Sequence, residues 1–331
     1  AVRTTIDAEL QFYLNCLSGI VPDSGVLSSA ETSPNETAAD AETDGEADDP
    51  TQNEIASESE QNDITVASAC PLEAAASDEV EARAKRLLAA TELSVFVLDA
   101  KTGDALAALQ TGNDRLGNRI SEKTFHAYAP GSLLTFFTAL TAYENGWSPA
   151  TGVFDMPSFS KEPLPAAYLA EEPDELGPIR LRTALTKDRL APILDVTRKL
   201  GSEKILRTLD EFGLTNWSGL SADRLYFDGG YVTAEALAIA FSTFAGSGQI
   251  NGVYLNERDT LPRPRTVREA YTPSSPDPIE LQPRGAIQLV DESLAYLVNH
   301  TFSAETEVYR ILNRPAVVKT GKSLSETSRW L

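Results

Sequence analysis

The sequence PGSLLTFFTALTAYENG, residues 130–146, carries the strongest structural signal in the chain. A Pro-Gly-Ser opening is followed by apolar side chains that fall on nearly all sides of a helix, and Asn145-Gly146 is a typical helix end. A helix that is apolar all round is buried, so we expect a central core helix with Ser132 at its N-terminus. The simplest alternative role for Ser132 is that of a helix cap.

The flanking segments predict both strands and helices. Apolar and β-branched residues at 93–98 and 105–109 surround a turn-forming stretch, 99–103, which is typical of a β-hairpin inside a sheet. Helical spacing predicts further helices over residues 7–17, 77–88, 181–200, 203–212, 233–246 and 291–300. A strand-like run is expected at 316–319, and irregular structure in the proline-rich stretch 262–283. The chain is therefore predicted to be an α+β protein, with an antiparallel sheet flanked by helices around the buried central helix.

Charge is concentrated in one segment. The net charge of −21 argues against a nucleic-acid partner, because such a partner requires a basic surface. Residues 31–63 contain twelve Asp or Glu and no Lys or Arg, with almost no large apolar residue. Such a stretch cannot bury enough surface to offset its ordering entropy. We predict a disordered acidic insertion at 23–66, most simply a solvated loop, which divides residues 1–22 from residues 67–331 of the same domain.

Two cysteines, Cys16 and Cys70, flank this insertion. In an oxidising compartment a bridge between them would close the base of the loop, whereas in a reducing one both would be buried thiols. Two His and two Cys at these spacings make no zinc pattern, so we expect no metal and no cofactor. The sequence has no run of eighteen apolar residues and starts at Ala1 without a signal-peptide core, so any membrane anchor is expected upstream.

Short motifs along the chain follow one another in an informative order. Pro130-Gly131-Ser132 heads the central helix, Arg182-Thr183-Ala184-Leu185 leads into the stretch 187–190, and Val318-Lys319-Thr320-Gly321 comes last, with Trp330 eleven residues after Lys319. This order and spacing resemble the transpeptidase domain of class A penicillin-binding proteins, over nearly the whole chain apart from the acidic insertion. The resemblance implies a penicillin-binding, β-lactamase-like fold that is truncated after the Lys-Thr-Gly strand, because a last strand and a C-terminal helix would follow Leu331.

The resemblance also assigns roles in acyl transfer. It places Ser132 where the family has its nucleophile, and a hydroxyl needs a base within hydrogen-bond reach. The family supplies a lysine three residues on, on the same helix face. Thr135 stands there instead. In the second motif, Lys187-Asp188-Arg189-Leu190, Asp188 replaces a serine and Leu190 an asparagine.

Only the third motif matches the family pattern. The resemblance implies that Lys319 and Thr320 hold the carboxylate of a peptidoglycan stem peptide or a β-lactam. Gly321 would let a peptide approach as an added strand, and the amides of Ser132 and Lys322 would form an oxyanion hole. The alternative is that Lys-Thr-Gly has no binding role, because these three residues are also common at the end of a strand.

Together with these departures, the resemblance implies an extracytoplasmic, membrane-anchored domain of peptidoglycan biosynthesis that acylates poorly and acts by binding peptides or by scaffolding other synthases. An active D,D-transpeptidase, in which Lys187 or Asp188 has become the base, is the alternative. A third hypothesis makes the chain an accessory domain of a glycosyltransferase-bearing protein. His126, six residues before Ser132, leaves a Ser-His-Asp arrangement open.

Overall fold

The computed structural model describes residues 2–18, 92–113, 119–157, 164, 168–169, 174–217, 224–227, 229–273, 275, 277–279, 281, 283–303, 316–323 and 329–331. The acidic insertion at 23–66, the expected helix at 77–88 and Cys70 lie outside these residues. The domain boundaries and the cysteine pairing therefore stay predictions. The described helices include none that is long and apolar enough to cross a membrane.

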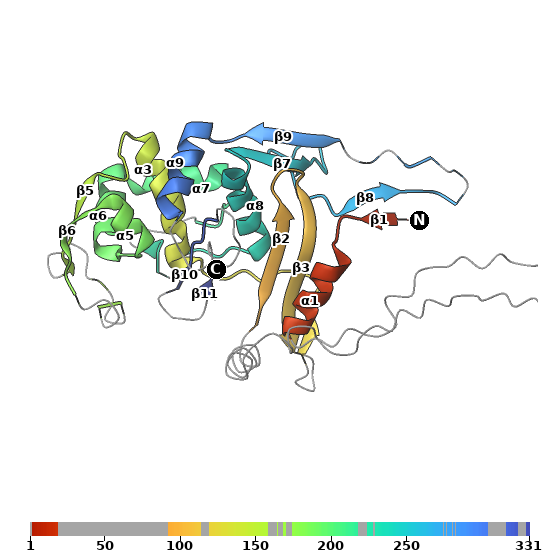
Figure 1. Cartoon of the computed structure of the whole chain (residues 1–331), viewed down its shortest axis with the longest axis horizontal. Helices are drawn as coiled ribbons and strands as arrows, with labels where there is room; N and C mark the ends of the chain where they lie inside the picture. The colour runs from red at the N-terminus through yellow and green to blue at the C-terminus, as the bar shows by residue number, and fades with distance from the viewer. Residues whose placement is uncertain are drawn as a thin grey trace, which may run out of the picture.

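The predicted hairpin is confirmed. β2 (Ser94–Asp99) and β3 (Asp104–Asn113) pair antiparallel, and β4 (Arg119–Ser121) adds a third strand on the other side of β3. The Asp99 carboxylate closes the turn by accepting the Lys101 amide at 2.8 Å. Figure 1 shows the hairpin between α8 (Ala234–Ala245) and α1 (Ala8–Ser18), in agreement with the contacts of α8 with β2 and of α1 with β3.

The N-terminal helix is held to this sheet by side-chain bonds. The Asp7 carboxylate caps α1 by accepting the Leu10 amide at 3.0 Å. One turn later, the Gln11 side chain bonds the main chain of Ala108 in both directions, at 3.0 and 2.9 Å. Without Gln11, the amide and carbonyl of Ala108 would lack these hydrogen bonds, so the Gln11 side chain takes the place of a neighbouring strand at this point of β3.

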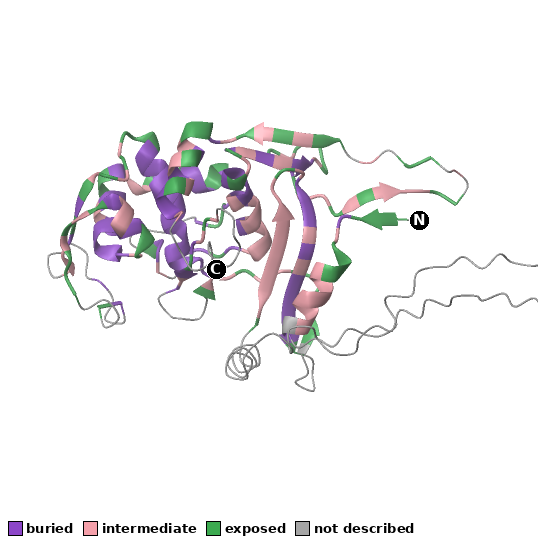
Figure 2. Cartoon of the chain, in the orientation of Figure 1, coloured by how far each residue is buried: buried purple, intermediate pink, exposed green. Residues whose placement is uncertain are grey.

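The core lies between the helices, as Figure 2 shows from the buried residues gathered there and along β3. α3 (Thr135–Glu144) is the predicted central helix, and all of its residues except Glu144 are buried. Phe136 and Phe137 pack with Phe241 and Phe244 of α8, with ring centroids 4.7 to 6.1 Å apart. The surrounding helices are α5 (Leu181–Thr186), α6 (Leu190–Leu200), α7 (Ser202–Glu211) and α9 (Glu292–Phe302).

Short strand pairs complete the described structure. They are β1 (Val2–Thr4) with β8 (Val267–Ala270), β5 (Gly152–Asp155) with β6 (Gly177–Arg180), β7 (Gln249–Val253) with β9 (Arg284–Gln288), and β10 (Gly321–Lys322) with β11 (Arg329–Trp330). The expectation of irregular structure over 262–283 is thus wrong at β8. Its four residues, VREA, contain no proline, so they can pair with β1.

Two further predictions need correction. The helix expected over 181–200 is two helices, α5 and α6, because Asp188 adopts a left-handed φ of 50° between them. Asp tolerates this conformation better than most residues, which periodicity does not reveal. The strand expected at 316–319 begins later, at Gly321, where β10 meets β11.

Candidate active site

Ser132 lies in the 3₁₀ turn η2 (Gly131–Leu134), which leads directly into α3. The residue is buried, with 4% of its surface exposed. Its hydroxyl does not cap a helix, since no side chain caps η2 or α3. Instead, the Lys322 amide donates to Ser132 Oγ at 3.2 Å. The structure therefore brings the nucleophile position and the strand after Lys-Thr-Gly together, and it excludes the simple capping role.

Two glycines allow that strand to approach η2 closely. Gly131 has a φ of 54°, and a Cβ there would lie 1.9 Å from the Lys322 carbonyl oxygen. A Cβ on Gly321 would lie 2.5 Å from the Leu133 nitrogen. The Gly321 position thus faces η2, which gives this glycine a packing reason beside the peptide-approach role inferred from the motif. Gly131 was not predicted as a site residue. Its position directly before Ser132 is the feature of the sequence that could have indicated its role.

Trp330 fixes the same segment from β11. Its indole N–H donates to the Ala129 carbonyl at 2.9 Å, and its backbone pairs with Gly321. Its ring meets that of Tyr128 edge-on, with centroids 6.3 Å apart. The Trp330 spacing noted in the sequence therefore corresponds to a contact that ties β11 to the residues before Ser132.

Thr135 occupies the position one helical turn after Ser132 and is fully buried. Its hydroxyl lies 2.8 Å from the Ser132 carbonyl oxygen and 3.4 Å from Asp188 Oδ1. A hydroxyl has one hydrogen, so the shorter contact is the stronger bond. Thr135 therefore satisfies a backbone carbonyl and provides no group that could accept the Ser132 proton near neutral pH.

Asp188 reaches the site because the chain breaks between α5 and α6. Arg189 anchors the break: its amide donates to the Ala184 carbonyl at 2.9 Å, and its Nε lies 2.6 Å from Asp155 Oδ2. The Arg189 and Asp155 side chains are only 4% and 0% exposed. This buried ion pair holds the chain next to Asp188, and the carboxylate itself contacts Thr135 and Lys319.

That carboxylate pairs with the lysine of the third motif. Lys319 Nζ lies 2.7 Å from Asp188 Oδ1 and donates to the Thr320 carbonyl at 2.6 Å. The Lys319 side chain is 6% exposed. Burial lowers the pKa of Lys319, and the charge and hydrogen bond of Asp188 oppose that shift. Polar contacts thus link Thr135, Asp188 and Lys319 in one continuous chain.

The structure also separates some of the predicted candidates. The Lys187 side chain is exposed at the end of α5, and Thr320 is exposed as well. Among the described residues, no group of three or more His, Cys, Asp or Glu could hold a metal ion. A cavity of about 280 Å³ beside α8 and residues 258–263 contains none of the predicted site residues. The candidate site is therefore the cluster of Ser132, Thr135, Asp188, Lys319 and the Lys322 amide.

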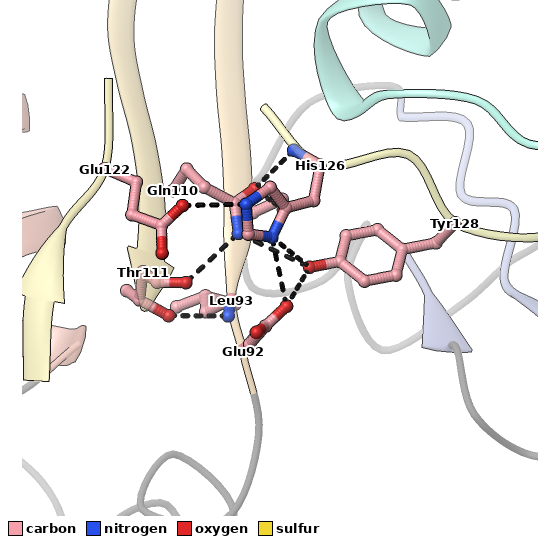
Figure 3. Close-up of polar contacts among 8 residues, drawn as sticks. Glu92, Leu93, Gln110, Thr111, Glu122, His126 and Tyr128 are labelled. Carbon is pink, nitrogen blue, oxygen red and sulfur yellow. Dashed lines mark hydrogen bonds and ion pairs between the residues drawn. The ribbon is translucent and has the colours of Figure 1, made fainter. Parts of the chain in front are cut away.

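His126 has other partners than Ser132. Figure 3 shows its ring between two carboxylates, with Nε2 2.7 Å from Glu122 and Nδ1 3.2 Å from Glu92. The Tyr128 hydroxyl also bonds Glu92. The hydrogen bond that the ring donates to Glu92, together with the charges of both carboxylates, raises the pKa of His126. No hydrogen bond among the described residues joins His126 to Ser132, so the geometry does not support a Ser-His-Asp arrangement.

This chain is similar to known proteins both in sequence and in fold. Penicillin-binding protein 1A of Rickettsia bellii (strain RML369-C) is 30% identical over 126 residues, which are 37% of this chain and 16% of that protein. The imipenem acyl-enzyme of penicillin-binding protein A from M. tuberculosis superposes with a TM-score of 0.57 at 16% identity, over 70% of this chain and 62% of that one. PonA1 from Mycobacterium tuberculosis gives 0.54 at 16% identity, over 70% and 61%.

The two solved structures show the fold, and this chain spans less than two thirds of each relative. The family model "Penicillin binding protein transpeptidase domain" matches residues 93–322, which contain every residue of the candidate site. Because this match covers more than half of the sequence, the chain belongs to the family of penicillin-binding protein transpeptidase domains.

Proposed function

We propose that this domain serves peptidoglycan assembly by binding wall peptides, directly or as a scaffold beside other synthases, and that it acylates far more slowly than an intact transpeptidase site. One observation carries the proposal. Within the described part of the chain, the Ser132 hydroxyl has a single hydrogen-bond partner, the Lys322 amide, which is a donor. The proton that must leave Ser132 has no acceptor there.

Acyl transfer requires that acceptor at its first step. As the Ser132 oxygen attacks a carbonyl carbon, a C–O bond forms and the hydroxyl proton moves to a base. A positioned base contributes about 10² to 10⁴ in rate. The Lys322 amide donates to the reacting oxygen itself, so it would serve a ligand carbonyl only after leaving Ser132 Oγ.

An active enzyme with a substitute base is the rival. Of the two candidates, Lys187 is exposed, and Asp188 directs its carboxylate to Lys319 and Thr135. Because this carboxylate is already engaged by an ammonium and a hydroxyl, it is less available to accept the Ser132 proton. The contacts therefore favour the impaired site over the rival.

A labelled β-lactam tests the proposal, because labelling reports serine acylation. We expect Thr135→Lys to label at least about a hundredfold faster than the unmodified protein, since it restores a base one turn from Ser132. Thr135→Met, of similar length but without an amine, is the matched control and should stay slow. Adding Ser132→Ala should abolish all labelling.

Fast labelling of the unmodified protein that disappears in Ser132→Ala would show that another group is the base, and the proposal would fail. Absence of labelling in Thr135→Lys, and also after adding Asp188→Asn to remove the carboxylate beside Lys319, would count against ligand binding at this site. Thermal unfolding of each variant confirms that the new side chain, placed at a fully buried position, has not unfolded the domain.

A further inference from the structure

The cation of the third motif already has a counter-ion. Lys319 Nζ contacts Asp188 Oδ1 at 2.7 Å and the Thr320 carbonyl at 2.6 Å, and its side chain is almost fully buried. An ammonium has three hydrogens, so two are committed within the protein. A ligand carboxylate that approached Lys319 would meet an ion pair whose net charge is zero.

Electrostatics then disfavours a second carboxylate. It would have to leave water, share an ammonium with Asp188 and lie beside a like charge. Juxtaposed like charges at a partly buried site reduce affinity strongly. The neighbouring cation Arg189 cannot compensate in the same way, because it is buried against Asp155 at 2.6 Å. The overall charge of −21 acts in the same direction.

Asp188 is placed at the site by a defined local structure. Its backbone holds a φ of 50°, and the next residue is anchored by a buried ion pair. Non-glycine residues in this conformation persist when the surrounding structure determines them, and they concentrate at functional sites. The Asp188 carboxylate is therefore a built-in part of the site.

We propose that Asp188 determines ligand specificity: the site selects peptides whose end beside Lys319 is uncharged, such as a C-terminal amide or a continuing main chain, over peptides that end in a free carboxylate. This inference rests on the peptide-binding role proposed above. Thr320 is exposed, so its hydroxyl offers such an end a neutral hydrogen-bonding group.

Two fluorescent peptides test the inference: an N-acylated D-alanyl-D-alanine with a free carboxylate, and the same peptide with a C-terminal amide. Equilibrium binding is measured by polarisation on the unmodified protein. We expect the amide to bind at least about tenfold more tightly than the acid. In Asp188→Asn, which keeps a residue that tolerates a left-handed φ, the preference should vanish or reverse, because Lys319 becomes available to the acid.

Asp195→Asn is the matched control, because Asp195 on α6 pairs with Lys199 at 2.7 Å on the surface and its loss changes net charge equally. This variant should keep the preference for the amide. Asp188→Ser provides a second neutral residue in case the asparagine variant does not fold. A preference for the acid in the unmodified protein, or an unchanged preference in both Asp188 variants, overturns the inference.

The two experiments distinguish failure of the impaired-acylation proposal from failure of the specificity inference. Fast β-lactam labelling of the unmodified protein refutes impaired acylation and leaves the measured preference intact. If neither peptide binds to the unmodified protein or to either Asp188 variant, both the specificity inference and the peptide-binding role are overturned.

Discussion

The ion pair between Arg189 and Asp155 gives the sharpest prediction about how the site is built. Arg189 Nε lies 2.6 Å from Asp155 Oδ2, and the two side chains are 4% and 0% exposed. Arg189 also donates to the Asp174 carbonyl. Replacing Asp155 with Ala leaves a buried guanidinium without its counter-ion, in a place where water cannot screen it.

Loss of one partner of a buried pair costs about 3–5 kcal/mol, and this low exposure calls for no discount for solvent. In a domain of this size, each kcal/mol lowers the melting temperature by about 2–4 °C, so Asp155→Ala should melt about 6–20 °C lower. Urea unfolding should give the same free-energy loss. The surface pair of Arg3 with Glu269, at 70% and 34% exposure, is the control: Arg3→Met should leave the melting temperature almost unchanged.

The double variant Asp155→Leu with Arg189→Met separates charge from packing. It removes both charges together and should recover most of the stability lost in Asp155→Ala. Arg189→Met alone should also weaken the preference of the site for amide peptides, because Asp188 loses its anchor. The reasoning would be refuted if Asp155→Ala cost less than about 1 kcal/mol, or if the double variant were less stable than either single one.

Three other changes probe separate parts of the fold. The pKa of His126 is raised above 6.5, so its contribution to stability is present below pH 6.5 and is lost as pH rises through the raised pKa. His126→Gln should therefore make the melting temperature depend less on pH between pH 6 and 9, and an equal pH dependence in both proteins would contradict this. Gly131→Ala adds a Cβ 1.9 Å from the Lys322 carbonyl and should cost clearly more in urea unfolding than Gly146→Ala, whose φ of 82° is also positive but whose surroundings are open. Tyr226→Phe removes a fully buried hydroxyl that bonds two threonines at 2.7 and 2.6 Å, so about 1–3 kcal/mol should be lost, whereas a neutral result would mean that those threonines find other partners.

Local patterns in the sequence predicted the elements with strong periodicity. α3 was predicted because apolar residues surround it, and the hairpin because two apolar runs flank Asp99 and Gly103. The helices that begin near Asp7 and Thr233 were predicted from helical spacing, and both side chains bond nearby amides. These signals lie within a few residues of each other, so a single sequence contains them.

The site was predicted in part by motif order. Ser132, Thr135, Asp188 and Lys319 were named from their spacing, and the contacts bring them together. Their roles in catalysis and ligand binding stay predictions. Gly131 was missed as a site residue because its reason is a contact with Lys322, far along the chain.

The sequence by itself determined the identity of the groups: a serine before a buried helix, a threonine in place of a base, and an aspartate in the second motif. Only the tertiary structure decided which charge meets which. The break at Asp188 depends on a left-handed backbone and on the neighbouring Arg189, which pairs with Asp155, 34 residues before it in the sequence. The ion pair between Asp188 and Lys319 joins residues that are 131 positions apart. Periodicity reports burial along one element, whereas a pairing between distant charges is fixed by how separate elements pack.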